Sequence, residues 1–281
     1  MTPLLFWTFA IGILTAMACA VCGTLLVVKR EAFISEGLSH AVLPGIILAY
    51  IFIPDRSSLL LIFAAGLSGL IMVGLVQAIA STQLVHRDAA LGIVFSALFS
   101  VGVIASATNL GNVHFHADCI IDGNLSLAAL NEFQIGGRSL GPRAFATMAL
   151  LFGILTCFIV TFYKELKLMA FDEATAKLMG FRPKLLHAAW LALVSMTTVA
   201  AFETAGTILV VALMIVPAAT ANLLTNRLPT MFVLGPLLGA AAAALGVWLG
   251  VALDISPAGP IATTSGILFL ATTGIVKTVN R

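Results

Sequence analysis

Charged side chains are scarce in this chain of 281 residues. Aspartate, glutamate, lysine and arginine make up 9% of the sequence, whereas 60% of residues are hydrophobic and the mean hydropathy is +1.12. Soluble domains carry about 25% charged residues, so this composition excludes the soluble class. The formal net charge of +2 is too small to indicate a nucleic-acid partner. The sequence therefore predicts an integral membrane protein that contacts lipid and binds no nucleic acid.

Sequence motifs for catalysis are also missing. The sequence contains no G-x-x-x-x-G-K-[ST] phosphate-binding loop, no metalloprotease helix motif and no nucleophile–histidine–acid set. Three of the four cysteines, Cys19, Cys22 and Cys157, lie inside apolar runs, which argues against a disulfide framework. We therefore expect the chain not to be an enzyme. If ATP powers its activity, a separate ATP-binding subunit must hydrolyse it.

Apolar runs, each close to the roughly 20 residues that cross a bilayer, follow one another along the whole chain. The nine runs are 4–28, 36–53, 58–80, 88–107, 144–163, 186–203, 205–222, 230–252 and 257–276. As one helix, residues 186–222 would be about 55 Å long, well beyond the bilayer, so we expect a turn at Glu203–Gly206. The prediction is an all-α integral membrane fold with about nine transmembrane helices in a single domain, 1–281.

Basic residues indicate how these helices are oriented. If the chain starts outside, 11 of the 14 lysines and arginines fall in inner segments and three, Arg56, Arg138 and Arg143, fall in outer ones. Cytoplasmic segments of membrane proteins collect lysine and arginine. We therefore predict an N-terminus outside and a cytoplasmic C-terminus.

The second apolar run contains an ionisable pair, Glu36 and His40. At i and i+4 they share one helical face with Cβ atoms about 5–6 Å apart. A carboxylate with an imidazole suits Mn²⁺, Fe²⁺ or Zn²⁺ better than Mg²⁺ or Ca²⁺. Two ligands do not close a site, so a second copy of the helix or other spans would complete it. The alternative is a structural Glu–His hydrogen bond.

Pro44 and Gly45 follow within about one turn and predict a kinked or broken helix beside the pair.

The outer connection, residues 108–143, holds a second group of possible ligands. His114, His116 and Asp118 alternate as they would on one face of an extended strand, and Asp118 and Asp122 have helical i, i+4 spacing. The alternatives are a metal site near the outer mouth, with Asp118 and His116 as ligands, or a solvated loop.

The inner connection, KELKLMAFDEATAKLMGFRPKL at 164–185, is too charged to span a membrane. Asp172 is a candidate N-cap, Gly180 has the position of a left-handed helix-ending residue, and Pro183 prevents the helix from resuming. We expect a short amphipathic helix at the cytoplasmic surface. From the residues alone it could lie on lipid headgroups or dock a soluble partner.

Three stretches together resemble the membrane permeases of bacterial zinc/manganese/iron ABC importers. Residues 34–45, ISEGLSHAVLPG, are similar to the family's G-D-A-[LI]-S-H-A-V-L-P-G; residues 164–180 look like its cytoplasmic coupling segment; and residues 206–221, GTILVVALMIVPAATA, are close to G-[TI]-L-L-V-x-A-L-L-I-x-P-A-A-T-A. The match covers essentially the whole chain in length and order.

This resemblance implies a type II importer permease fold in the bacterial inner membrane. It also implies three kinds of partner: two ATP-binding subunits, a second permease copy or paralogue, and an extracytoplasmic solute-binding protein. The cargo would be Mn²⁺, with Zn²⁺ or Fe²⁺ close behind, and no cofactor would be bound permanently. An ion-coupled secondary metal carrier without an ATPase is the alternative, although we find no internal inverted repeat.

The resemblance also implies roles for single residues. His40 matches the histidine of the family's metal site, Glu36 stands where the family usually has aspartate, and Asp118 is the counterpart of an acid in the external connection. A helix from Phe171 to Gly180 would insert into the ATPase. The coupling residues are Phe171, Asp172, Ala176 and Gly180.

Overall fold

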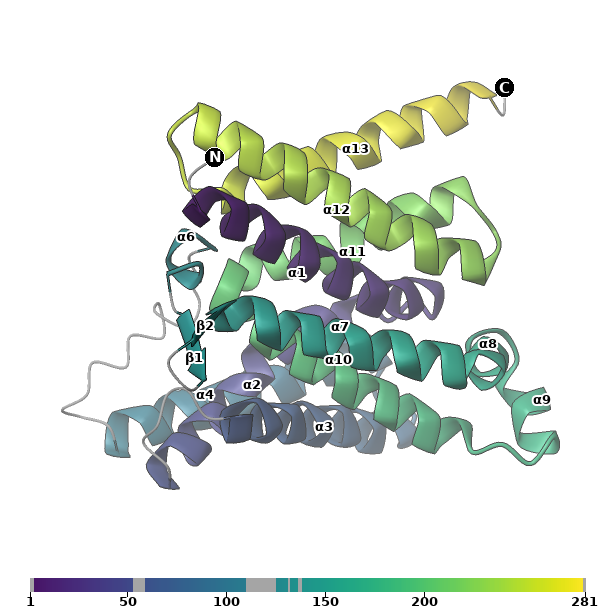
Figure 1. The fold of residues 1–281 in the computed structure, drawn as a ribbon. Coiled ribbons are helices and arrows are strands. Elements are labelled where there is room, and N and C mark those ends of the chain that lie inside the picture. Colours follow the sequence, from purple (N-terminus) through teal and green to yellow (C-terminus); the bar gives the residue numbers. More distant parts are fainter. Residues whose placement is uncertain (1–2, 53–58, 110–124, 131, 136–137, 280–281) are drawn as a thin grey trace. The chain divides into compact units, whose positions relative to one another are not determined.

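The computed structural model describes residues 3–52, 59–109, 125–130, 132–135 and 138–279, which are almost entirely helical (Figure 1). The long helices are α1 Pro3–Val28, α2 Phe33–Phe52, α3 Leu59–Ser81, α4 Arg87–Asn109, α7 Arg143–Thr161, α10 Pro183–Ala205, α11 Thr207–Leu224, α12 Leu228–Ala252 and α13 Ala258–Val279. The shorter elements are α6 Leu125–Ala128, α8 Tyr163–Phe171, α9 Glu173–Leu178, and the antiparallel strands β1 Glu132–Ile135 and β2 Arg138–Pro142.

The apolar runs and the long helices largely coincide, because each of the nine predicted runs overlaps mainly with one long helix. The run 144–163 extends by one residue into α8, and the run 205–222 begins at the last residue of α10. Among the described residues, seven helices are long and apolar enough to cross a membrane, and α2 and α3 contribute the shorter apolar helical segments Phe33–Ala49 and Gly66–Ser81. The all-α transmembrane fold is therefore confirmed, with about nine helices.

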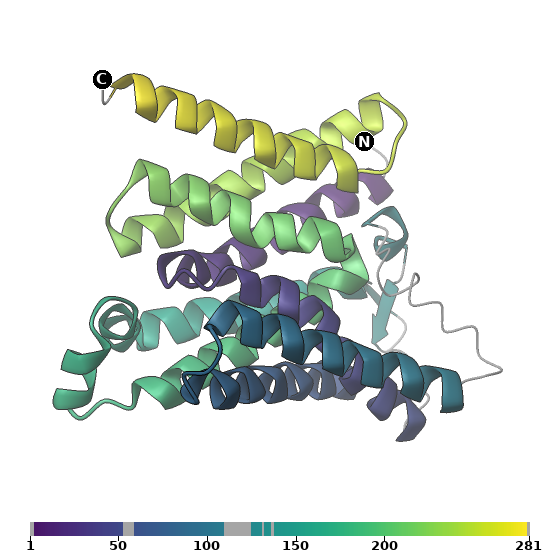
Figure 2. The same cartoon turned by 180° about the vertical axis from the view of Figure 1, so that it is seen from behind.

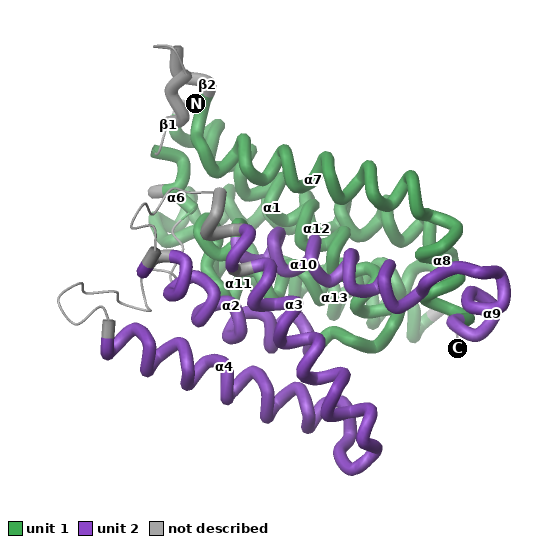
Figure 3. Tube along the Cα trace, turned by 90° about the horizontal axis from the view of Figure 1, so that it is seen from below, with its two compact units in different colours: residues 1–32, 120–172, 200–281 green, residues 33–119, 173–199 purple. Residues whose placement is uncertain are grey.

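Contacts between residues divide the chain into two compact units (Figure 3). Unit 1 consists of residues 1–32, 120–172 and 200–281, and unit 2 of residues 33–119 and 173–199. Both units are discontinuous in sequence, and the chain passes from one to the other within α10. That residues 1–281 form a single transmembrane domain stays a prediction.

In unit 1, α1 packs against α7, α11 and α12, and α13 packs against α11 and α12. Figures 1 and 2 show α11 and α12 between α1 and α13 from both sides. A Cβ at Gly23 of α1 would overlap the backbone carbonyl of Met214 in α11, so only glycine permits this close approach. Cys19 and Cys22 of α1 are fully buried. Small residues at such crossings allow membrane helices to pack closely.

Unit 2 is built on α2, which packs against both α3 and α4. Glycine again allows close contact here: a Cβ at Gly69 of α3 would lie 2.8 Å from the Leu38 side chain of α2. It would also overlap the Ser195 hydroxyl of α10. Leu38 and Ser195 are both completely buried. The helix that carries the ionisable pair is therefore held on two sides within its own unit.

The expected turn between α10 and α11 is confirmed. α10 ends at Ala205 and α11 begins at Thr207, with Gly206 between them at φ 80° and ψ 159°. This backbone conformation is essentially restricted to glycine. The Gly206 N–H still donates to the Phe202 carbonyl, and the Gly206 carbonyl accepts from Val210. One residue thus separates two helices while the backbone hydrogen bonds on either side of it are kept.

Candidate functional site

The structure brings Glu36 and His40 together on α2. Glu36 lies in the first turn of the helix, and its Oε1 is 3.5 Å from Nε2 of His40. Their side chains are 49% and 40% exposed. The separation exceeds the 2.7–3.2 Å of an ordinary N–H···O hydrogen bond. The two groups are near enough to share a ligand, and they are also within ion-pair distance of each other. Both the ion-binding and the structural interpretation of the pair therefore remain predictions.

Two aromatic rings of α4 hold the His40 imidazole. Phe95 stacks on it with ring centroids 5.4 Å apart and planes at 22°, and Phe99 meets it edge-on at 5.4 Å and 82°. Contacts of this kind limit the rotation of the imidazole and therefore the direction in which its nitrogens point. Sequence reasoning missed both phenylalanines. Their i, i+4 spacing in the fourth apolar run was the available signal, but it does not say which helix they face.

α2 continues as a single helix through Pro44 and Gly45 to Phe52, so the helix is not broken there, and a kink at this point stays a prediction. Proline lacks the N–H that would bond the carbonyl four residues earlier. The carbonyl left without this partner is that of His40, whereas Ser68 of α3 donates to the next carbonyl, that of Ala41, and a Cβ at Gly45 would lie 2.7 Å from the Ala64 carbonyl oxygen. Side chains and tight neighbours of this kind keep membrane helices intact around proline.

A complete metal site does not lie within the described ranges. Across them, no group of three or more histidine, cysteine, aspartate or glutamate residues is placed to hold a metal ion. His116 and Asp118, predicted as ligands in the outer connection, lie outside the described residues, as do His114 and Asp122. The predicted ligands that the structure describes are thus Glu36 and His40.

The inner connection forms two short helices where one was expected. The predicted helix from Phe171 to Gly180 is wrong at its start, because α8 ends at Phe171 and α9 begins at Glu173. Asp172, between them, has φ −150° and ψ 83°, outside the helical region. The Asp172 N–H donates the last hydrogen bond of α8 to the Leu168 carbonyl, and Asp172 directly precedes Glu173, the first residue of α9. Aspartate favours this non-helical N-cap position, which explains why one helix stops where the next begins.

The predicted end of this segment is confirmed. Gly180 adopts φ +82°, its N–H donates to the Lys177 carbonyl, and the N–H of Phe181 donates to the Ala176 carbonyl, each at 3.1 Å. This is the paired hydrogen-bond pattern of a Schellman motif. A left-handed conformation is available to glycine without the penalty that a Cβ brings.

Side chains around this segment differ in what they can contact. Phe171 is 61% exposed, Leu178 89% and Met179 62%, so all three present apolar surface. Ala176 is 1% exposed. Of the residues predicted to couple to an ATPase, Phe171 thus presents apolar surface and Ala176 does not, and the coupling role itself stays a prediction.

Comparison with known proteins identifies the family. The model of the ABC 3 transport family matches residues 1–275. Curated relatives include the manganese transport system membrane protein MntD of Bacillus subtilis, 34% identical over 94% of this chain and 89% of the relative. The zinc transport system membrane protein TroD of Treponema pallidum is 39% identical over 92% of this chain and 70% of its own. A probable iron transport system membrane protein of Haemophilus influenzae is 30% identical over 90% and 83%.

A solved structure agrees with these sequence matches. PsaBC from Streptococcus pneumoniae in complex with Fab superposes with a TM-score of 0.79 and 27% identity, covering 96% of this chain and 90% of that chain. The resemblance inferred from the three motifs is therefore confirmed at the level of the fold and of the whole sequence. The chain belongs to the ABC 3 transport family.

Proposed function

We propose that this chain is the permease subunit of an ATP-driven importer for a divalent transition metal ion, with Mn²⁺ favoured and Zn²⁺ or Fe²⁺ close behind. The observation that carries the proposal is the Glu36–His40 pair, set 3.5 Å apart in the first two turns of a helix that is otherwise largely apolar. Ionisable groups in such helices are costly and are characteristic of ion pathways. The relatives named for manganese, zinc and iron transport support a metal as the cargo.

The Glu36 carboxylate and the His40 imidazole do not by themselves select one of these three metals. A carboxylate and an imidazole bind Zn²⁺ more tightly than Mn²⁺ in the Irving–Williams order. Selectivity for Mn²⁺ would then come from the site's geometry, from the protein that delivers the ion, or from supply. Glu36 is one methylene longer than the aspartate usual in the family, which changes the reach of the carboxylate.

The site is proposed to be completed by a second permease, either a copy of this chain or a paralogue. Glu36 and His40 are about half exposed, so their ligand atoms remain open to another chain. Two such pairs would supply two carboxylates and two imidazoles, a number of ligands that suits these metals. Phe95 and Phe99 would keep each imidazole aimed at the shared ion.

Alternating access is the proposed mechanism. An extracytoplasmic solute-binding protein delivers the ion to the outer mouth, where Asp118 and His116 are proposed to receive it, and the ion then passes to Glu36 and His40. Two ATP-binding subunits supply the energy, and their movement reaches the spans through residues 164–185, with Phe171 as the main contact. The chain lies in the bacterial inner membrane with its N-terminus outside and its C-terminus in the cytoplasm.

Metal accumulation in cells tests this proposal. We expect Glu36→Ala and His40→Ala each to reduce the uptake of one metal to background, measured by elemental analysis at trace supply. The matched control is His86→Ala, which removes an exposed imidazole outside α2 and should transport normally. Copurification of the ATP-binding subunit shows whether each variant still assembles. Uptake at the wild-type rate in an assembled Glu36 or His40 variant would refute the proposed role.

A further inference from the structure

Asp88 is an exposed acidic residue in the first turn of α4. An acid at this position commonly caps free N–H groups of the first turn or interacts favourably with the helix dipole. Within the described ranges, however, the Asp88 carboxylate forms no hydrogen bond and no ion pair. Its oxygens are therefore available to a ligand.

Asp88 lies on the face of α4 that contacts His40. Phe95 and Phe99, whose rings hold the His40 imidazole, follow Asp88 at i+7 and i+11. At 3.6 residues per turn, both positions are within about 20° of Asp88 around the helix axis. Gly92 lies between Asp88 and Phe95 on this face, and a Cβ there would meet nothing within 4 Å. Space therefore remains beside this face, between Asp88 and the rings.

Contacts between α2 and α4, both in unit 2, show the level of Asp88 relative to the ionisable pair (Figure 3). A Cβ at Gly37 would lie 3.1 Å from the Leu91 side chain, and the His40 ring stacks on Phe95. The residue numbers of the contacts rise together in the two helices, with an offset of 54 at Gly37 and 55 at His40. The two helices therefore run parallel, and their N-terminal ends lie on the same side.

Asp88 is nearer than Glu36 to these N-terminal ends. The offset places Glu36 level with Ala90, and Asp88 precedes Ala90 by two residues, or about 3 Å along the helix axis. Side chains on a helix lean toward its N-terminus, which carries the Asp88 carboxylate further in that direction. In the proposed orientation of the chain, these N-terminal ends lie on the cytoplasmic side. Asp88 is therefore an oxygen ligand on the inward side of the pair.

The pair and Asp88 form two successive positions. They are not one three-ligand site, because no such group of three is placed to hold a metal ion in the part of the chain that the structure describes. A site with fewer charged ligands binds a metal ion more weakly, so a single carboxylate holds it less tightly than a carboxylate with an imidazole. An ion passes through a membrane protein when each position is weak enough to release it to the next.

We propose that Asp88 is the exit ligand of the transported metal ion. Its carboxylate takes the ion from Glu36 and His40 and releases it toward the cytoplasm. This role rests on the proposed metal import and adds the residue for its inward step. Because the ion is captured before it reaches Asp88, loss of the Asp88 carboxylate should slow release more than it weakens capture.

Metal accumulation at increasing supply tests this role, with Mn²⁺, Zn²⁺ and Fe²⁺ measured by elemental analysis. Asp88→Asn should lower the maximal uptake rate about tenfold, as expected when one contact to a charged ligand is lost, and leave the half-saturating metal concentration within about twofold. Asp88→Glu keeps a carboxylate and should retain about half of the wild-type rate or more. Copurification of the ATP-binding subunit shows whether each variant assembles.

The matched control moves the acid instead of removing it. Asp88→Asn combined with Ala89→Asp keeps the net charge and an acid in the first turn of α4, but rotates this acid by about 100°, away from the face of Phe95 and Phe99. Ala89 is exposed, so the substitution leaves the apolar interior intact. The double variant should be as slow as Asp88→Asn, and Ala89→Asp alone should transport like the wild type.

Several outcomes would overturn the exit role. Wild-type uptake by an assembled Asp88→Asn variant would remove it and leave the proposed importer intact. Recovery of the rate in the double variant would mean that Asp88 serves only the dipole of α4. A higher half-saturating concentration at an unchanged maximal rate would place Asp88 in ion capture. If the wild-type chain raised the accumulation of none of the three metals, the proposed function would fail and the exit role with it.

Discussion

Two pairs of ionisable side chains have the same i, i+4 spacing in very different parts of this molecule. Glu36 and His40 approach to 3.5 Å on α2, and Glu173 and Lys177 approach to 2.8 Å on α9. All four side chains are between 40% and 53% exposed. Geometry and exposure therefore hardly separate the two pairs. Their surroundings do, because α2 is an apolar helix with two aromatic rings against the imidazole, whereas α9 is six residues of a charged connection.

The comparison shows that spacing alone is a weak sign of function. An exposed pair on a short helix contributes only about 0.3–0.5 kcal/mol and needs no further role. Glu36 and His40 lie in a helix without other charged residues. Placing ionisable groups in a membrane helix costs free energy, and this cost calls for a functional reason.

The largest difference is expected when each pair is removed. Glu36→Ala with His40→Ala should bring metal uptake to background, because both predicted ligands are lost. Glu173→Ala with Lys177→Ala should leave the half-saturating metal concentration within about twofold, since this pair is not a predicted ligand and an exposed pair contributes little stability. Parallel accumulation measurements on the two double variants check this. A comparable loss of metal transport in both double variants, with the same change in half-saturating concentration, would mean that the Glu36–His40 pair has no special role compared with the Glu173–Lys177 pair.

A second large effect is expected at Phe171, next to α9. Phe171→Asp replaces exposed apolar surface with a charge and should weaken the association of the ATP-binding subunit by about 2 kcal/mol, roughly thirtyfold. Copurification and ATP hydrolysis measure this. Leu253→Asp, which places a charge on a leucine of similar exposure (63%) directly after α12 and outside residues 164–185, is the control. If Phe171→Asp assembled and transported normally, docking at this residue would be wrong.

A smaller effect is expected from the rings that hold His40. Phe95→Ala and Phe99→Ala keep both predicted ligands but free the imidazole, and loss of such an orienting contact lowers metal affinity about tenfold. We expect a higher half-saturating metal concentration with the maximal uptake rate retained. Phe63→Ala, at an exposed phenylalanine of α3, is the control. A fall in maximal rate with unchanged affinity would contradict a positioning role.

The smallest effect concerns the end of α9. Gly180→Ala places a Cβ on a residue at φ +82° and should cost about 1 kcal/mol locally. Gly180→Asn, which tolerates this conformation better, should cost less. Hydrogen exchange at residues 173–181 measures the change. Equal protection in wild type and Gly180→Ala would mean that the left-handed conformation is not required.

Much of the fold could be predicted from the sequence because a helix needs about 20 consecutive apolar residues to cross a bilayer. Each predicted run overlaps mainly with one long helix, and Gly206 marks the turn that the length of residues 186–222 required. The pairing of Glu36 with His40 depends only on helical periodicity and was equally accessible. Gly180 was recognised because a helix end followed by proline requires a particular backbone conformation.

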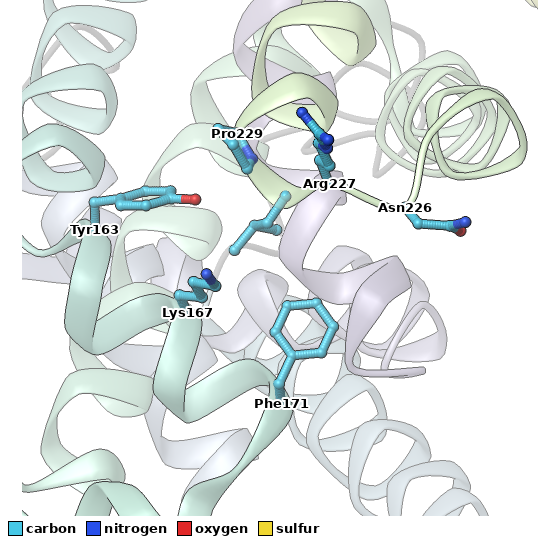
Figure 4. Close-up of a pocket in the computed structure, with 7 residues that line it drawn as sticks. Tyr163, Lys167, Phe171, Asn226, Arg227 and Pro229 are labelled. Atoms are coloured by element: carbon cyan, nitrogen blue, oxygen red, sulfur yellow. The ribbon is translucent and has the colours of Figure 1, made fainter.

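Features that depend on contacts distant in sequence were not accessible. No local pattern shows that Phe95 and Phe99 face His40, or that Ser68 donates to the Ala41 carbonyl. Lys167 of α8 and Leu228 of α12 line one pocket although they are far apart in sequence, and only the folded chain brings these two helices together (Figure 4). The division at Asp172 was missed for a different reason, since an N-cap residue predicts where a helix begins but not that another helix runs up to it.

The contact between Gly23 of α1 and the Met214 carbonyl of α11 has a mechanical consequence. Because the two backbones meet with no side chain between them, any larger residue at position 23 would have to push α1 and α11 apart. One residue therefore sets the spacing of this crossing, and α12, which packs against both helices, depends on that spacing as well.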